Sequence, residues 1–156
     1  MHFTTLLASV AALAPMVSAV GDAVVVNNCA DPVYLWSVGS SVSPMQTIEA
    51  DGQYSEVLHY DDVSGGISLK ITTGSNGLYD GSPQTNFAYS LDGNNIWYDL
   101  SDVFGDPFSG NPLVVTPSIT TCPNICWASG VSPSGSQTQE CDASSNITLT
   151  LCADQC

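Results

Sequence analysis

The placement of the six cysteines constrains this chain more than any other feature. Cys29 stands alone near the start, and the other five crowd the C-terminal end at Cys122, Cys126, Cys141, Cys152 and Cys156. An even number of cysteines in an exported chain predicts disulfides, because oxidising compartments let them persist. Cys29 must then find its partner across nearly the whole chain, so its bridge is expected to tie the first strand to the last.

An apolar leader precedes all six cysteines and predicts export. Residues 6–13 form its hydrophobic stretch, Pro15 interrupts the run, and residues 17–19 (Val-Ser-Ala) offer a small-residue cleavage site. The run is too short to span a membrane, so we interpret residues 1–19 as a signal peptide rather than as an N-terminal core helix. Cleavage leaves residues 20–156 as one domain, secreted and either extracellular or associated with a cell wall.

The charge balance of the chain is strongly acidic. Fifteen Asp and Glu residues face a single lysine, Lys70, and no arginine, which gives a formal net charge of −14. Nucleic acids and anionic membrane surfaces are therefore excluded as partners, because binding them needs cationic side chains. Neutral glycans and cationic proteins stay open as partners, and solubility with tolerance of low pH is the simplest explanation.

The pattern of short alternating segments predicts an all-β fold. Gly, Pro, Asn, Asp and Ser bound these segments, and no segment shows a sustained apolar period of 3.6 residues. Many short strands of this spacing are typical of an antiparallel β-sandwich. The expected strands are residues 23–26, 32–38, 54–60, 67–71, 87–91, 96–100 and 147–152.

The sequence offers no complete set of catalytic or metal-binding residues. After export only His59 remains of the two histidines, and its apolar neighbours favour a position in a strand over a role as a base. No nucleophile-elbow motif accompanies it. The spacings Cys122–Cys126 and Cys152–Cys156 could suit a metal, but disulfides are favoured in an exported chain. We therefore expect no metal and no cofactor.

Three aspartates lie close together after an alternating segment. Asp99 is expected on the strand face opposite Tyr98, and Asp102 and Asp106 in the turn that follows. Such residues cap turns through their own backbone, bind calcium, or contact a glycan beside an aromatic ring such as Trp97. The spacing alone leaves these three alternatives open.

Several segments resemble a known protein family. The segments are residues 22–29, 32–39, 65–71, 96–101 with 105–108, and 148–152. Together they are similar to the fungal CetA-like family, also called the Blastomyces yeast-phase-specific family, which comprises small antigenic thaumatin-like proteins. The resemblance implies a small thaumatin-like antiparallel β-sandwich, stapled by disulfides, in residues 20–156.

A weaker similarity to plant thaumatin-like proteins concerns their acidic cleft, which is linked to β-1,3-glucan. Asp99 matches a cleft aspartate, Asp102 is a second acid, and Lys70 stands roughly where the family has an arginine. Ala88 replaces the glutamate of the cleft, and a lysine cannot reproduce the bidentate contacts of an arginine. The resemblance therefore implies glycan contact without glucanase activity. The glycan-binding candidates are Lys70, Trp97, Asp99, Asp102 and Asp106.

Three functions compete at this point. The first is a secreted, non-catalytic thaumatin-like surface or cell-wall protein that contacts a β-glucan or a host surface protein. The second is an endo-β-1,3-glucanase-like enzyme that uses an acidic cleft. The third is a secreted effector that binds a host protein.

The resemblance also guides the expected disulfides. Plant thaumatins carry a disulfide between the two places that correspond to Cys29 and Cys152. Nothing in the sequence selects among the pairings of the other four cysteines, so one of these pairings is simply assumed. The expected pairs are Cys29–Cys152, Cys122–Cys156 and Cys126–Cys141.

One sequence motif predicts N-glycosylation. Asn146-Ile147-Thr148 is the only Asn-x-Ser/Thr sequon with an allowed middle residue. It opens the last expected strand, where Asn146 can face solvent.

Overall fold

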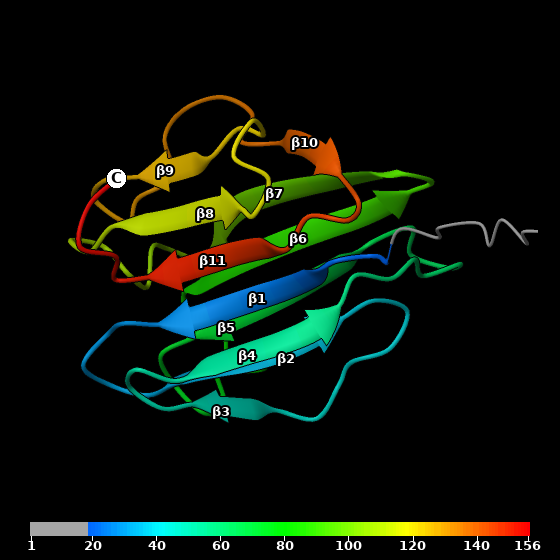
Figure 1. The fold of residues 1–156 in the computed structure, drawn as a ribbon. Helices are drawn as coiled ribbons and strands as arrows, with labels where there is room; N and C mark the ends of the chain where they lie inside the picture. Colours follow the sequence, from blue (N-terminus) through cyan, green and yellow to red (C-terminus); the bar gives the residue numbers. More distant parts are fainter. Residues whose placement is uncertain (1–18) are drawn as a thin grey trace, which may run out of the picture.

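Alternation of buried and exposed residues along the strands builds two sheets that pack face to face. In a computed structural model, the described residues 19–156 form eleven strands and no helix (Figure 1). The predicted signal peptide, residues 1–19, lies outside the described residues apart from Ala19. In β1 (Asp22–Asn27) every second residue is buried. Its consecutive valines suit a strand because β-branched side chains pack well on a pleated surface.

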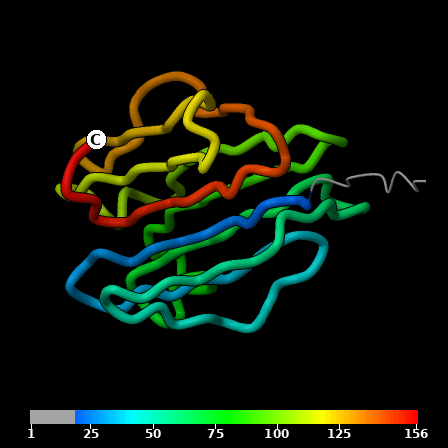
Figure 2. The backbone as a smooth tube through the Cα atoms, viewed as in Figure 1, coloured from blue at the N-terminus to red at the C-terminus, as the bar shows by residue number. Residues whose placement is uncertain are grey.

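The five-stranded sheet joins strands from both ends of the chain. Its order is β4 (Gln53–Val57), β1, β11 (Ile147–Leu151), β8 (Leu113–Pro117) and β9 (Ile125–Trp127). β1 and β11 run parallel, with Val25 opposite Leu149, and the other neighbours run antiparallel. Figure 2 shows the blue start of the chain beside the red strand near its end.

The six-stranded sheet is antiparallel throughout. Its order is β10 (Gln139–Asp142), β7 (Asn95–Val103), β6 (Gln84–Asp92), β5 (Ile67–Thr72), β2 (Val33–Val38) and β3 (Gln46–Ile48). β5, β6 and β7 follow one another in the chain and pair in that order. The register places Ala88 of β6 between Ser68 of β5 and Asp99 of β7.

The core lies between the inner faces of the two sheets. The five-stranded sheet contributes Val25, Val115 and Leu149, all fully buried. Leu69 and Phe87 are fully buried on the opposing six-stranded sheet. No helix among residues 19–156 is long and apolar enough to cross a membrane.

The predicted all-β sandwich is confirmed, with corrections to individual strands. β3, β8, β9 and β10 were not expected, and the strand expected at residues 54–60 ends at Val57. The expected purely antiparallel arrangement is wrong for β1 and β11, which run parallel. A parallel pair needs a long connection, and here the chain passes through the six-stranded sheet between β1 and β11.

The disulfides agree with one expected pair and correct the other two. Cys29 is joined to Cys152, as the resemblance implies, but Cys122 is joined to Cys141 and Cys126 to Cys156. The expected pairs Cys122–Cys156 and Cys126–Cys141 are wrong because of strand faces. Cys141 is buried on the inner face of β10 opposite Ile96, whereas Cys126 lies between two buried residues of β9 and faces outward.

Candidate functional site

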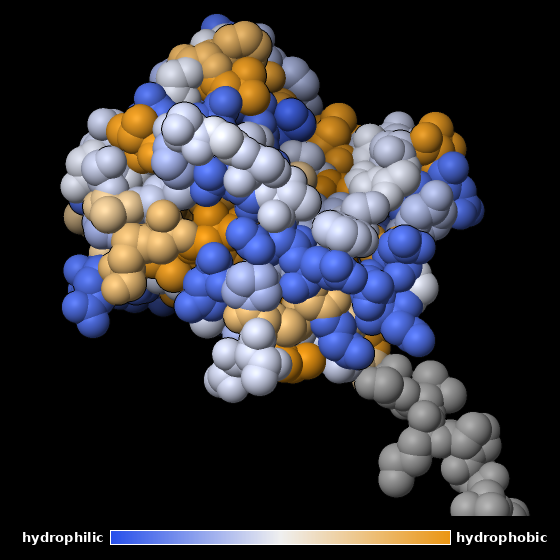
Figure 3. Space-filling view, turned by 90° about the horizontal axis from the view of Figure 1, so that it is seen from above, coloured by the Kyte–Doolittle hydropathy of each residue, from blue (hydrophilic) through white to orange (hydrophobic). Residues whose placement is uncertain are grey.

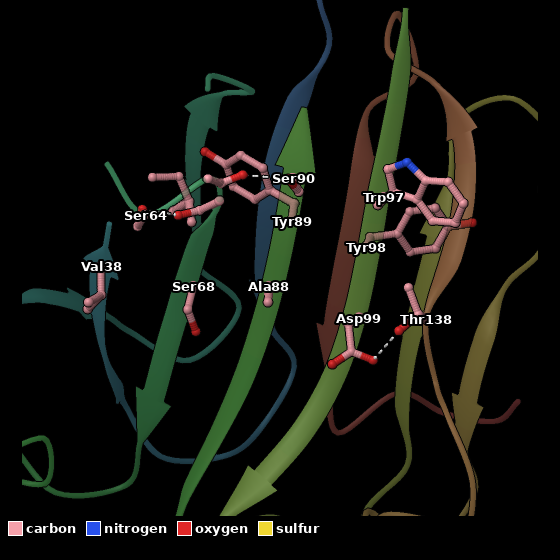
Figure 4. Close-up of a pocket in the computed structure, with 13 residues that line it drawn as sticks. Val38, Ser64, Ser68, Ala88, Tyr89, Ser90, Trp97, Tyr98, Asp99 and Thr138 are labelled. Carbon is pink, nitrogen blue, oxygen red and sulfur yellow. Dashed lines mark hydrogen bonds between the residues drawn. The ribbon is translucent and has the colours of Figure 1, made fainter. Parts of the chain in front are cut away.

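The outer face of the six-stranded sheet carries a groove of about 420 Å³. Its floor is the row formed by Ser68, Ala88 and Asp99 on three adjacent strands. Trp97 and Thr138 line one side, and residues 64–66 line the other (Figure 4). The groove exists because alternate residues of β5, β6 and β7 are small or polar, while the residues between them fill the core.

Asp99 is the acidic group of the groove. Its carboxylate accepts a hydrogen bond from the Thr138 hydroxyl at 3.3 Å, and Figure 4 shows the two side chains turned toward one another. Burial raises the pKa of Asp99 above its usual value, and the Thr138 hydroxyl partly offsets this. Asp99 lies within β7 rather than at its end, on the face opposite Tyr98 as predicted.

Trp97 gives the groove an exposed aromatic surface. It lies two residues before Asp99 on the same face of β7 and is 41% exposed, whereas the intervening Tyr98 is buried in the core. An indole ring in this position combines an apolar face with one polar N–H. Such a surface can pack against the C–H face of a sugar ring.

Ala88 lies directly across from Asp99. Facing positions on antiparallel strands hold their Cβ atoms about 4.5–5.5 Å apart, so a carboxylate at position 88 would stand beside that of Asp99. The methyl group of Ala88 leaves Asp99 without a carboxyl neighbour on β6. The groove therefore presents one acid rather than a pair.

Lys70 lies on the same outer face but outside the groove lining. It is half-buried in β5, two residues beyond Ser68, with Trp36 and Asn86 as its neighbours across the sheet. Trp36 is almost fully buried and meets the exposed Tyr79 ring edge-on, with ring centroids 6.3 Å apart. Tyr79 therefore packs on Trp36 and does not line the groove.

Asp102 lies on the opposite face of β7 from Asp99. The expectation that it lies in a turn is wrong, because β7 continues to Val103 without a break in register. Three residues along a strand reverse the face, so Asp102 points inward beside the buried Thr85. The Thr85 hydroxyl donates to one carboxylate oxygen at 2.5 Å, and the other oxygen is buried without a partner among residues 19–156.

Asp106 lies in the loop after β7, as predicted, and acts on Asp102. Burial, together with the nearby Asp106 carboxyl, raises the pKa of Asp102 to about 7, against the lowering effect of the Thr85 hydroxyl. Asp102 is therefore protonated over much of the acidic range. The five candidates thus separate into Trp97 and Asp99 in the groove, Lys70 beside it, Asp102 at the inner face, and Asp106 in the exposed loop after β7.

Several groove residues were missed in the sequence. Ser68 and Ser90 lie on the outer face of expected strands, so strand alternation alone could have identified them. Thr138 could not be found in this way, because it lies in the irregular segment before β10, which was not expected.

His59 and Asn146 lie away from the groove. His59 is exposed two residues after the end of β4, so the expected strand position is wrong. Asn146 is exposed, and its side-chain oxygen accepts a hydrogen bond from the backbone N–H of Asp22 at 2.9 Å. Within the part of the chain that the structure describes, no three His, Cys, Asp or Glu residues are placed to hold a metal ion.

The surface is largely polar around the edge strands. Figure 3 views the molecule from the side of β8–β10, and hydrophilic residues cover most of this face, with hydrophobic residues in separate patches. This distribution agrees with the formal net charge of −14.

Comparison with known proteins adds three findings. A family described as Blastomyces yeast-phase-specific protein matches residues 10–153. The antigenic thaumatin-like protein of Arthroderma benhamiae is 30% identical over 98% of this chain and 85% of its own length. The secreted thaumatin-like protein calA of Emericella nidulans is 32% identical over 84% of this chain and 81% of its own length.

The fold also matches a solved structure. The protein elicitor MoHrip2 from Magnaporthe oryzae superposes with a TM-score of 0.70 at 26% identity. The match covers 85% of this chain and 99% of that one.

Proposed function

This chain belongs to the Blastomyces yeast-phase-specific protein family, and we propose that it is a secreted, non-catalytic thaumatin-like protein whose outer groove contacts a neutral glycan such as a β-glucan. The observation that carries this proposal is the pairing of Ala88 with Asp99 across the groove floor. It leaves a surface with one acid, one exposed indole and several hydroxyl groups. Such a surface suits binding rather than bond cleavage.

The absence of a second carboxyl group in the groove argues against glycoside hydrolysis. A glycosidase holds two carboxyl groups about 5–9.5 Å apart across the scissile bond. Ala88 stands where the nearest partner would be, and Asp102 lies on the other side of the sheet from Asp99. The only groove carboxylate within residues 19–156 is therefore that of Asp99.

The remaining groups suit a neutral sugar. Ser68, Ser90 and Thr138 supply hydroxyl groups, and Asp99 supplies an acceptor for sugar hydroxyls. Trp97 supplies the apolar surface on which a sugar ring can pack. A neutral ligand also avoids repulsion from the net charge of −14.

Sedimentation with insoluble β-1,3-glucan tests the binding site. Trp97→Ala should weaken binding about three- to tenfold through lost packing, and Asp99→Asn about two- to fivefold through weakened hydrogen bonds. Asp154→Asn is the matched control, because it makes the same charge change at an exposed C-terminal residue. Equal binding by all four proteins would show that the groove is not the contact surface.

Release of reducing sugar from soluble β-1,3-glucan tests the non-catalytic part. The wild-type protein should release none above background at any pH between 4 and 8. Hydrolysis that is lost in Asp99→Asn would contradict the proposal. Ala88→Glu restores a carboxyl group beside Asp99 and shows whether that position alone separates binding from catalysis.

A second candidate function is that of a secreted effector that contacts a host protein. Its support is the similarity in fold and sequence to a protein titled a protein elicitor. This candidate needs a protein-binding surface separate from the groove.

A further inference from the structure

Two neighbouring loops expose a group of apolar side chains at one end of the sandwich. They belong to residues 39–45, which connect β2 and β3, and to residues 57–64, which run from the last residue of β4 toward β5. Val63 is 83% exposed and Val57 is 62% exposed. The other exposed apolar side chains of these loops are Val42, Met45 and Tyr60. Exposed apolar side chains on these loops offer contact area for a partner that approaches this end of the sandwich.

Asp61 holds the two loops together. One of its carboxylate oxygens accepts the backbone N–H and the hydroxyl of Ser40, at 3.0 and 2.7 Å. The other accepts the backbone N–H groups of Val63 and Ser64, at 3.0 and 2.7 Å. These donors, with Ser64 first, hold the pKa of Asp61 well below its usual value, so the residue keeps its negative charge in acidic surroundings.

A hollow of about 230 Å³ lies between these loops, with the Glu56 carboxylate in its lining. The Tyr54 hydroxyl donates to one oxygen of Glu56 at 2.6 Å, and the Tyr89 hydroxyl donates to the other at 2.5 Å. Burial first, and then the Glu56 carboxylate, raises the pKa of both tyrosines, so they remain neutral donors. The two tyrosine hydroxyls fix the orientation of the Glu56 carboxylate, and its oxygens keep lone pairs free for a donor from outside.

His59 forms part of the rim of the hollow. Its Nδ1 lies 2.9 Å from the carbonyl oxygen of Val57 and 3.1 Å from the Tyr89 hydroxyl. A carbonyl oxygen only accepts, so Nδ1 carries the proton in this contact. The ring stands edge-on to Tyr89, with ring centroids 6.0 Å apart, and adds a flat aromatic surface beside Glu56.

The charges of the hollow specify a cationic occupant. Glu56 and Asp61 both line it, and the chain has no arginine and only one lysine, Lys70, which lies in β5 outside the lining. A guanidinium group fits these partners because it is planar, permanently charged, carries five N–H donors and stacks on aromatic rings. We propose that this end of the sandwich docks a partner protein through an arginine whose guanidinium enters the hollow, while apolar neighbours of that arginine pack on the exposed loops.

A second copy of this chain does not meet the requirement. It contains no arginine, and its Lys70 is half-buried on the outer face of a sheet. Two copies also repel one another through their net charges of −14. The occupant is therefore a different protein with a basic segment. The hollow and the glycan groove share Ile67 in their linings, but Glu56 and Asp61 line only the hollow, and Trp97 and Asp99 line only the groove.

Titration of the ¹⁵N-labelled secreted protein with the peptide acetyl-Leu-Arg-Leu-amide tests the inference by NMR. We expect saturable shifts of the amides of residues 56–63 and none at Ala88, Trp97 and Asp99 of the groove. Glu56→Gln should weaken binding about tenfold or more, because it removes a charge-assisted hydrogen bond. Asp62→Asn, with the same charge change on the same loop but outside the lining, should change the affinity less than twofold.

A second variant, a control peptide and a glucan-binding measurement make each outcome decisive. Val63→Ser alters only an exposed side chain, and it should weaken the peptide about twofold to fivefold even if Glu56→Gln disturbs folding. Equal binding of acetyl-Leu-Gln-Leu-amide, unchanged affinity in both Glu56→Gln and Val63→Ser, or shifts confined to the groove would each overturn the inference. Glucan sedimentation by Glu56→Gln should match the wild type, so failure of this surface is distinguishable from failure of the groove.

Discussion

The two sheets of this protein are assembled in different ways. The five-stranded sheet pairs β1 with β11, strands from opposite ends of the described chain, whereas β5, β6 and β7 of the six-stranded sheet pair in the order in which they occur. Two of the three disulfides involve the five-stranded sheet alone: Cys29–Cys152 joins the ends of β1 and β11, and Cys126–Cys156 joins β9 to the segment that follows β11. The six-stranded sheet takes part in one, through Cys141.

This difference bears on where the cross-links and the groove lie. Distant pairing is costly because a long loop must close before any contact forms, and a disulfide removes part of that cost from the unfolded chain. The strands β5–β7 pair with their neighbours in the chain, so they need fewer disulfides to offset the entropy of loop closure. Their outward-facing residues can therefore be small and polar. The groove accordingly lies on the six-stranded sheet, and the cross-links concentrate on the five-stranded one.

The largest expected effect is on the long-range disulfide. Replacing Cys29 and Cys152 by serine opens a link with a sequence separation of 123, and should lower the free energy of unfolding by about 4–5 kcal/mol. Replacing Cys122 and Cys141 opens a separation of only 19 and should cost about 3 kcal/mol. Guanidinium unfolding curves of the two double variants measure both values. An equal or greater loss for the shorter link would contradict the difference between the sheets.

A pair of core substitutions probes the order in which the sheets form. Leu149→Ala in β11 and Leu69→Ala in β5 each remove a fully buried side chain and should cost about 2–5 kcal/mol. If the local hairpins form first, Leu69→Ala mainly slows folding and Leu149→Ala mainly speeds unfolding. Stopped-flow kinetics over a range of denaturant concentrations distinguishes the two. The reverse assignment would place the distant pairing in the folding nucleus.

The smallest expected effect on the free energy of unfolding comes from Asp102, and this effect depends on pH. Its pKa is raised from 3.8 to about 7, so its stabilising contribution is complete below pH 3.8 and is lost as pH rises through about 7. Because Asp102 is only half-buried, solvent screening reduces the effect to about 1–2 kcal/mol. The wild type should therefore be more stable at pH 5 than at pH 8, and Asp102→Asn should lose less stability across that range.

Thermal unfolding at pH 5 and pH 8 checks this expectation. The lowered pKa values of Asp61, Asp80 and Asp142 do not interfere, because those groups change their protonation below pH 4 in both states. Asp154→Asn is the matched control and should follow the wild type. A wild-type protein that gains stability from pH 5 to pH 8 would contradict the inward position of Asp102.

The strands with strict alternation were predictable from the sequence, and those without it were not. Ile67, Leu69 and Ile71 mark one face of β5 directly, and the structure buries all three. β3 and β9 have only three residues each, which is too few to show an alternating pattern. β8 follows Pro112 and has Pro117 as its last residue, and prolines indicate turns in a sequence. Short edge strands depend on their neighbours for hydrogen bonds, so their formation is decided by tertiary contacts.

The candidate site was predictable only as far as strand alternation reached. Trp97 and Asp99 were placed on one face correctly, but the strand was expected to end at residue 100, which put Asp102 in a turn. Continuing the alternation to residue 103 would have placed Asp102 on the inner face. The remaining misses, Thr138 and the pairing of Cys122 with Cys141, depend on how irregular segments meet, which no local pattern encodes.

The pairing of β1 with β11 sets a delay on the protein as it is made. β1 ends at Asn27, but its central partner β11 spans residues 147–151, so more than a hundred further residues are synthesised before the two strands can pair. At about 5–20 residues per second, the edge of β1 that pairs with β11 stays open for several seconds or longer, whereas β4 can occupy the other edge much earlier. During that interval the open edge of a β-branched strand can be bound by another chain, so the synthesis of β11 is the step that permits the sheet to close.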